Sequence, residues 1–165
     1  METAGSILKG KKILVVDDEK DILETIEDIL DEVKIDTATD YDTASFKIKS
    51  NQYDLAILDI MGVNGLDLLD EAVAREIPTV MLTAHAVNKE TLMASIRKGA
   101  IAYLPKEKLA ELDIFLTRLL AAQQRGEPPW KLLFEELGEY FNKRFGANWQ
   151  ETDHKFWTEF ERTYQ

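Results

Sequence analysis

Five polar residues with chemically useful side chains each stand at or just after the end of a short apolar run. They comprise three carboxylates, one hydroxyl and one amine: Asp17, Asp18, Asp59, Thr83 and Lys106. Carboxylates brought together repel one another unless a cation joins them. Hard oxygen ligands suit Mg²⁺, which binds through a few carboxylates and keeps several waters, and Mn²⁺ accepts the same donors.

Such a set of groups is suited to phosphoryl transfer. A magnesium site with open positions can hold phosphoryl oxygens, a lysine adds a point charge, and a threonine hydroxyl can donate a hydrogen bond. A carboxylate placed in line can act as the nucleophile and form an acyl phosphate. The metal and the lysine would then stabilise the charge during transfer.

The apolar runs that precede these residues alternate with amphipathic segments, which indicates five strand–helix pairs. The expected strands are near residues 12–16, 34–39, 55–58, 79–82 and 100–104. The expected helices cover about 22–33, 43–50, 66–74, 88–99 and 109–120. In the second helix Ala44 and Ile48 would face inward, with Phe46 as a further candidate, and Asn88 could cap the fourth helix. This alternation predicts an α/β fold, a doubly wound five-stranded parallel sheet with helices on both faces. Because function gathers outside the carboxyl ends of such strands, we expect the five polar residues to share one pocket.

Length and composition narrow the functional classes. The 165 residues suffice for one domain and a small appendage, and the formal net charge is −11. That charge disfavours binding to a nucleic-acid backbone, and no apolar run is long enough for a membrane span. There is no cysteine, which excludes thiol catalysis and zinc–thiolate sites. These features predict a cytoplasmic protein.

Four segments, in this order, resemble the motif set of receiver domains of response regulators in two-component signalling. They are Val15-Val16-Asp17-Asp18-Glu19, Leu58-Asp59-Ile60-Met61, Leu82-Thr83-Ala84 and the stretch from Gly99-Ala100 through Tyr103-Leu104 to Lys106. The resemblance covers residues 10–124 and implies the flavodoxin-like receiver fold.

The resemblance also implies roles for individual residues. Asp59 would receive a phosphoryl group from a histidine kinase or a phosphotransfer protein. Lys106 would pair with that group, Thr83 would swing toward it, and Tyr103 would rotate to report the state on the surface. Magnesium would be held by three side chains and one backbone carbonyl: Asp17, Asp18, Asp59 and Met61.

Two departures from the family pattern lie beside the expected pocket. The loop after Asp59 has no proline and is about two residues short, which affects the position expected for the Met61 carbonyl. Glu107 follows Lys106 where the family usually has proline, often after a cis bond. A cis bond at Lys106–Glu107 would cost about 3 kcal/mol, and the sequence leaves open whether the pocket requires it.

Plainer interpretations stand beside these roles. Asp17 and Asp18 could cap the following helix, Thr83 could simply end a strand, and Tyr103 could be a core aromatic. Lys106 could be a surface lysine. His85 could modulate the lifetime of the phosphorylated state or be a solvated loop residue.

Residues 125–129 form a polar, Gly- and Pro-containing linker to a tail, residues 130–165, that resembles no known family. The tail carries most of the chain's aromatic residues and predicts two amphipathic helices. The first helix would end at Gly146, and Asn148 with Glu151 resembles a capping box that opens the second. These helices would pack on each other or on the receiver, or form a dimerisation or docking surface. A DNA-reading helix-turn-helix is disfavoured because the tail is acidic.

Three functional hypotheses follow. The first is a non-enzymatic, phosphorylation-controlled switch that acts on a downstream protein or through self-association, without DNA or membrane binding. The second is a constitutive docking or dimerisation module on the same fold. The third, a phospho-aspartate hydrolase, is disfavoured because Met61 stands where such enzymes place a second aspartate.

Overall fold

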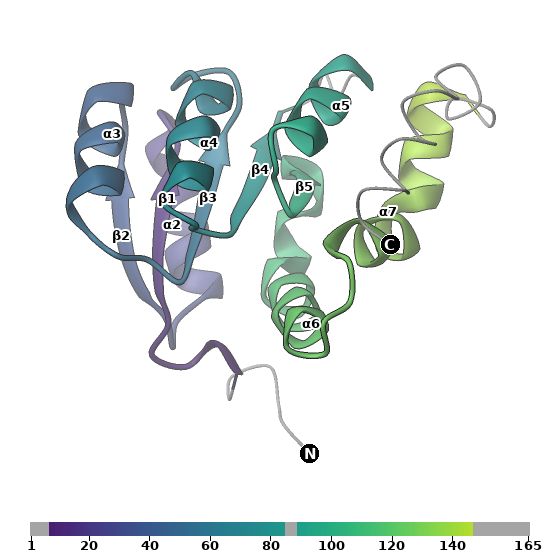
Figure 1. Cartoon of the computed structure of the whole chain (residues 1–165), viewed down its shortest axis with the longest axis horizontal. Helices are drawn as coiled ribbons and strands as arrows, with labels where there is room; N and C mark the ends of the chain where they lie inside the picture. The colour runs from purple at the N-terminus through teal and green to yellow at the C-terminus, as the bar shows by residue number, and fades with distance from the viewer. Residues whose placement is uncertain (1–6, 85–88, 147–165) are drawn as a thin grey trace.

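A computed structural model describes residues 7–84 and 89–146 of the chain. Its centre is a five-stranded parallel sheet with the strand order β2-β1-β3-β4-β5 (Figure 1). The strands are β1 (Lys12–Val16), β2 (Lys34–Ala38), β3 (Leu55–Asp59), β4 (Thr79–Thr83) and β5 (Ala102–Pro105). The predicted α/β, doubly wound sheet is therefore confirmed.

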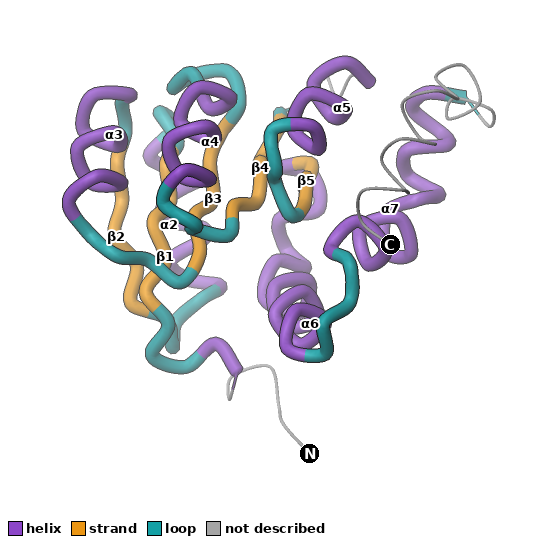
Figure 2. Tube along the Cα trace, in the orientation of Figure 1, coloured by secondary structure: helices purple, strands orange, loops and turns teal. Residues whose placement is uncertain are grey.

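Helices cover both faces of the sheet, as the tube in Figure 2 shows. The elements are α2 (Lys20–Ile29), α3 (Tyr41–Ser50), α4 (Gly65–Ala74), α5 (Lys89–Arg97), the 3₁₀ helix η1 (Lys106–Glu111), α6 (Leu112–Gln124) and α7 (Pro129–Phe145). Helices α3, α4 and α5 lie along one face of the sheet. Helices α2 and α6 lie on the opposite face, where they contact each other. All residues of β3, β4 and β5 are buried, as expected for strands covered on both sides.

One residue expected to face inward does not. Phe46 was a candidate for the buried side of its helix, but it is 69% exposed. The buried side of α3 is formed by Ala44, Ser45 and Ile48. Residues four apart share a helical face, and Phe46 lies two positions from both Ala44 and Ile48, which places it on the opposite side.

The last receiver helix, predicted at about 109–120, was wrong at its beginning. The chain leaves β5 through the 3₁₀ helix η1, and α6 begins only at Leu112. The bond between Lys106 and Glu107 is trans, like every other peptide bond in the described part of the chain.

The short loop after Asp59 closes tightly onto the end of β3. The Gly65 N–H donates to the Ile60 carbonyl at 3.0 Å, and Asn64 adopts a left-handed conformation with φ of 54°. A Cβ atom on Gly65 would lie 2.1 Å from the backbone oxygen of Asp59, so only glycine fits there. Helix α4 therefore begins directly against the end of β3.

Helix α7 follows α6 after a short connection and lies beside β5 and α6 (Figure 1). Its first residue is Pro129, a position that suits proline, and the chain leaves it at Gly146 with φ of 95°. The predicted end at Gly146 is thus confirmed. The second predicted tail helix, with Asn148 and Glu151, lies outside the described residues, as do His85 and the proposed cap Asn88. None of the described helices combines the length and apolar character needed to cross a membrane.

Candidate functional site

Asp17 lies at the carboxyl end of β1 and is fully buried. Its Oδ1 accepts a hydrogen bond from the Glu19 backbone N–H at 2.8 Å, so the carboxylate is fixed by the turn that leaves the strand. Its Oδ2 lies 2.9 Å from Lys106 Nζ and has no other partner among the described residues. Burial raises the pKa of Asp17, and the Glu19 N–H and Lys106 only partly offset that effect.

Asp59 is the last residue of β3, the strand next to β1, and only 3% of it is exposed. One of its oxygens accepts a hydrogen bond from the Gly62 N–H at 3.3 Å, and the other lies 3.5 Å from Lys106 Nζ. Burial raises the pKa of Asp59, with Lys106 acting in the opposite direction. An ionised Asp59 is therefore incompletely compensated by the protein alone.

Lys106 joins the two buried acids. Its ammonium lies between Asp17 and Asp59 and is also 3.5 Å from Glu19, and its side chain is 12% exposed. Burial would lower the pKa of Lys106, but the carboxylates around it outweigh burial and raise it. Lys106 is therefore a fixed positive charge at the centre of the site.

Asp18 projects on the exposed side, against the loop that follows β3. A Cβ atom on Gly62 would lie 2.3 Å from Asp18 Oδ1, so the bare backbone of this loop makes room for the carboxylate. Carboxylate oxygens of Asp17, Asp18 and Glu19 all lie within 4.8 Å of one another. Sequence reasoning missed Glu19 as a candidate ligand, although its place directly after the two aspartates was a usable signal.

The other predicted residues have different surroundings. Thr83 is buried at the end of β4, next to β3. Met61 lies on the loop after Asp59 with its side chain 76% exposed. Tyr103 is fully buried, and its hydroxyl is hydrogen-bonded to Thr91 at 2.7 Å. The structure thus brings Asp17 and Asp59 into contact with Lys106, and Tyr103 belongs to the core.

The donor set fits a hard divalent cation. Within the described part of the chain, the buried Asp17 Oδ2 has a single counter-charge, Lys106, and exposed carboxylates of Asp18 and Glu19 lie beside it. Oxygen-only ligands with one open, solvent-facing side are what Mg²⁺ uses when it retains waters. The residues present are therefore compatible with the cation predicted from the sequence.

The sequence model of the response regulator receiver domain matches residues 13–115. The chain belongs to this family. Receiver domains are signalling domains of two-component systems, and they generally bind Mg²⁺ in an acidic pocket.

Curated relatives of this receiver are response regulators. The phosphate regulon transcriptional regulatory protein PhoB of Klebsiella pneumoniae is 34% identical over 123 residues, which are 67% of this chain and 53% of that protein. The response regulator protein PilR of Pseudomonas aeruginosa is 32% identical over 80% of this chain and 34% of its own length. The receiver chain thus spans about half the length of its PhoB relatives.

Solved structures give the same result. A CheY-like receiver domain protein from Methanospirillum hungatei is 26% identical with a TM-score of 0.64, covering 72% of this chain and 99% of that one. The receiver domain of NtrX from Brucella abortus is 38% identical with a TM-score of 0.57, covering 64% and 94%. The receiver fold predicted from the motifs is confirmed.

Proposed function

We propose that this receiver is a phosphoacceptor switch in which Asp59 takes a phosphoryl group from a histidine kinase or a phosphotransfer protein. One observation carries the proposal: the Lys106 ammonium lies 2.9 Å from Asp17 and 3.5 Å from Asp59, although the three residues lie at the ends of three different strands. A carboxylate nucleophile, a second acid and a cation thus converge at the carboxyl ends of the sheet.

In the proposed reaction an Asp59 carboxylate oxygen attacks the phosphorus of a phosphohistidine. A P–O bond forms as the P–N bond breaks, and the imidazole nitrogen keeps the electron pair and takes up a proton. Asp59 ends as an acyl phosphate. Lys106 is placed to pair with the phosphoryl oxygens, and Thr83, at the neighbouring strand end, to donate its hydroxyl to one of them.

We assign the divalent cation, Mg²⁺ or Mn²⁺, to Asp17, Asp18 and Asp59, with the Met61 carbonyl as a further ligand and Glu19 at the rim. When bound, the cation would neutralise the charge that collects on the phosphoryl oxygens. The raised pKa values of Asp17 and Asp59 support this assignment, because a site whose acids are under-compensated gains most from a cation.

A constitutive docking module is the second candidate, and the tight loop favours it. Gly65 packs closely against the Asp59 backbone, and Gly62 packs closely against the Asp18 side chain. The loop therefore has little room to adjust its conformation around a metal. In this alternative the fold would serve as a binding platform without phosphorylation.

Binding of beryllofluoride with Mg²⁺ separates the two functions, because this anion mimics a phosphoryl group on a carboxylate. We expect binding that requires Mg²⁺ and is lost in Asp59→Asn, measured by ¹⁹F NMR or by a thermal shift. Asp28→Asn, which removes an exposed acid from α2, is the matched control and should bind like the parent. No binding by the parent protein would reject the switch and leave the docking module.

The proposed output is a protein–protein contact. Helix α7 uses its apolar side to pack on the receiver, with Leu133, Leu137 and Phe141 buried. The relative PhoB is named a transcriptional regulatory protein, but this chain covers only about half of it. We propose readout through a downstream protein or self-association rather than direct DNA contact, because the chain's net charge is −11.

A further inference from the structure

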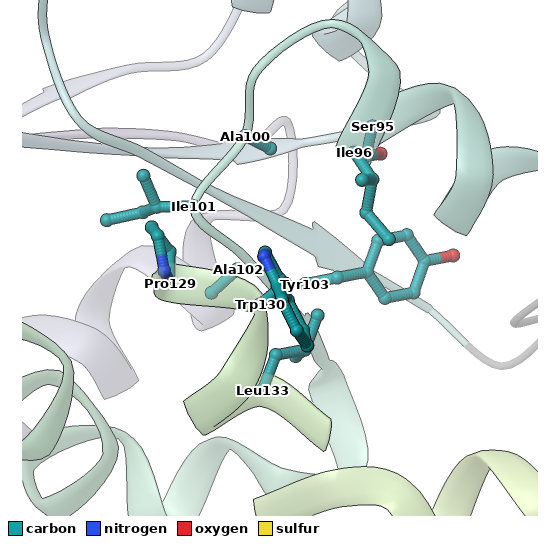
Figure 3. A pocket seen from close by; sticks show the side chains of 9 residues that line it. All are labelled: Ser95, Ile96, Ala100, Ile101, Ala102, Tyr103, Pro129, Trp130 and Leu133. Carbon is teal, nitrogen blue, oxygen red and sulfur yellow. The ribbon is translucent and has the colours of Figure 1, made fainter. Parts of the chain in front are cut away.

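Helix α7 is seated on the side of the receiver that contains Tyr103. Phe141 is fully buried, and its ring meets the Tyr103 ring edge-on, with centroids 6.2 Å apart at 64°. Closer to the start of α7, Trp130 and Leu133 lie beside Ala102 and Tyr103 (Figure 3). An aromatic contact of this kind contributes about 0.5–1.5 kcal/mol beyond the area that it buries.

This contact holds the Tyr103 ring inside the protein. The Tyr103 hydroxyl is hydrogen-bonded to Thr91 on α5, and the ring has no exposed surface while Phe141 covers it. Thr83 lies on the same side of the sheet, since Met81 pairs with Tyr103 and Thr83 is two residues further along β4. Tyr103 therefore stands between the α7 contact and a residue of the phosphorylation site.

A second contact joins α7 to η1, directly after β5. Glu107 accepts a hydrogen bond from the Tyr140 hydroxyl, and Arg144 Nη2 lies 2.9 Å from the same carboxylate oxygen. Glu107 directly follows Lys106, the cation of the site. Arg144 and Lys106 also line one cleft, which opens beside Glu19.

We propose that α7 is a built-in partner of the receiver whose docking favours the phosphorylated form, with Phe141 and Arg144 as positioning residues for Thr83 and Lys106. This inference rests on the proposed phosphoacceptor function. In this proposal, phosphorylation of Asp59 first changes how tightly α7, a helix of the same chain, is docked.

Two physical reasons set the sign of this coupling. If Thr83 moves toward a phosphoryl group on Asp59, it vacates space beside Tyr103, and a close-packed interior favours the ring position that fills it. The position that fills this space is the inward one, in which Phe141 already holds the Tyr103 ring. The phosphoryl group also adds negative charge beside the cleft that contains Arg144, which attracts the guanidinium and the helix that carries it.

Linkage requires the coupling to be equal in both directions. Beryllofluoride with Mg²⁺ should slow hydrogen exchange of the α7 amides in the full chain. Loosening α7 should in turn weaken beryllofluoride binding, by about fivefold or more if the coupling has a typical size.

Arg144→Gln is the principal test variant, because its side chain is 42% exposed and its loss should leave the fold intact. Arg144→Lys should restore part of the affinity. Lys143→Gln removes the same charge from the neighbouring, exposed position on α7 and should bind like the parent. Phe141→Leu keeps an apolar side chain and tests the ring contact without emptying the core.

The result that would overturn the proposal is equal beryllofluoride affinity in the parent, Arg144→Gln and Phe141→Leu. Unchanged or faster exchange in α7 on binding would overturn it as well. If the parent itself fails to bind beryllofluoride, both the proposed function and this inference fail. Binding that depends on Asp59 but is insensitive to α7 rejects the inference alone.

Discussion

At the residue scale, the burial of the Asp59 carboxylate carries an energetic cost. Its carboxylate is buried, and the charge that it carries is only partly balanced by Lys106 at 3.5 Å. A group whose pKa is raised on folding stabilises the fold below its unfolded pKa and loses that contribution as pH rises through the folded value. The ionised site should therefore weaken the metal-free fold at neutral pH.

We predict that Asp59→Asn stabilises the metal-free protein at pH 7, by about 1 kcal/mol. The difference from the parent should shrink as pH falls toward the ordinary carboxyl range, because the parent's Asp59 is then protonated. Thermal unfolding in EDTA across this pH range measures the effect. Asp28→Asn is the control for surface charge, and a destabilised Asp59→Asn at pH 7 would contradict the electrostatic account.

At the element scale, the beginning of α4 depends on a single glycine. Any side chain on Gly65 would meet the backbone oxygen of Asp59, which cannot move without shifting β3. The length of the loop, the first turn of α4 and the placement of Asp59 therefore depend on one another.

Gly65→Ala is predicted to destabilise the fold by about 2–4 kcal/mol and to weaken Mg²⁺ binding, since the strand end must move. Gly138→Ala, in the interior of α7 with open space around it, should instead stabilise the protein by about 0.5–1 kcal/mol. Chemical denaturation of both variants measures the contrast. Similar effects at the two positions would refute the steric argument.

Elements with a strong periodic pattern could be predicted from the sequence, and packing-dependent details could not. The apolar runs ending at Asp17 and Asp59 located two strands and their acids, because burial on both faces of a parallel sheet leaves continuous apolar segments. Phe46 was misplaced because its helix has a weak apolar pattern. The 3₁₀ helix after Lys106 and the contact of Phe141 with Tyr103 depend on tertiary packing, which no local pattern encodes.

At the scale of the whole molecule, the acidic site should couple cation binding to global stability. A cation that binds the folded chain and not the unfolded one stabilises it in proportion to the logarithm of its concentration. Its ligands must be ionised, and Asp17 and Asp59 both have raised pKa values, so the effect depends on pH.

We predict that millimolar Mg²⁺ raises the unfolding temperature at pH 7 by a few degrees, on the order of 1 kcal/mol, and much less near pH 4. Asp17→Asn should abolish most of the increase at pH 7. Calorimetry with NaCl at matched ionic strength is the control. An equal increase with NaCl alone would show general charge screening instead of a specific site.

The position of α7 has a consequence for the solubility of the chain. Among residues 7–84 and 89–146, β5 pairs with β4 only and ends the sheet, and an open strand edge is a template for adding another chain. All four residues of β5 are buried, and α7 lies against them. Variants in which α7 is released should therefore expose the edge of β5 and aggregate by intermolecular strand pairing. By covering this edge, α7 should also protect the chain from such aggregation.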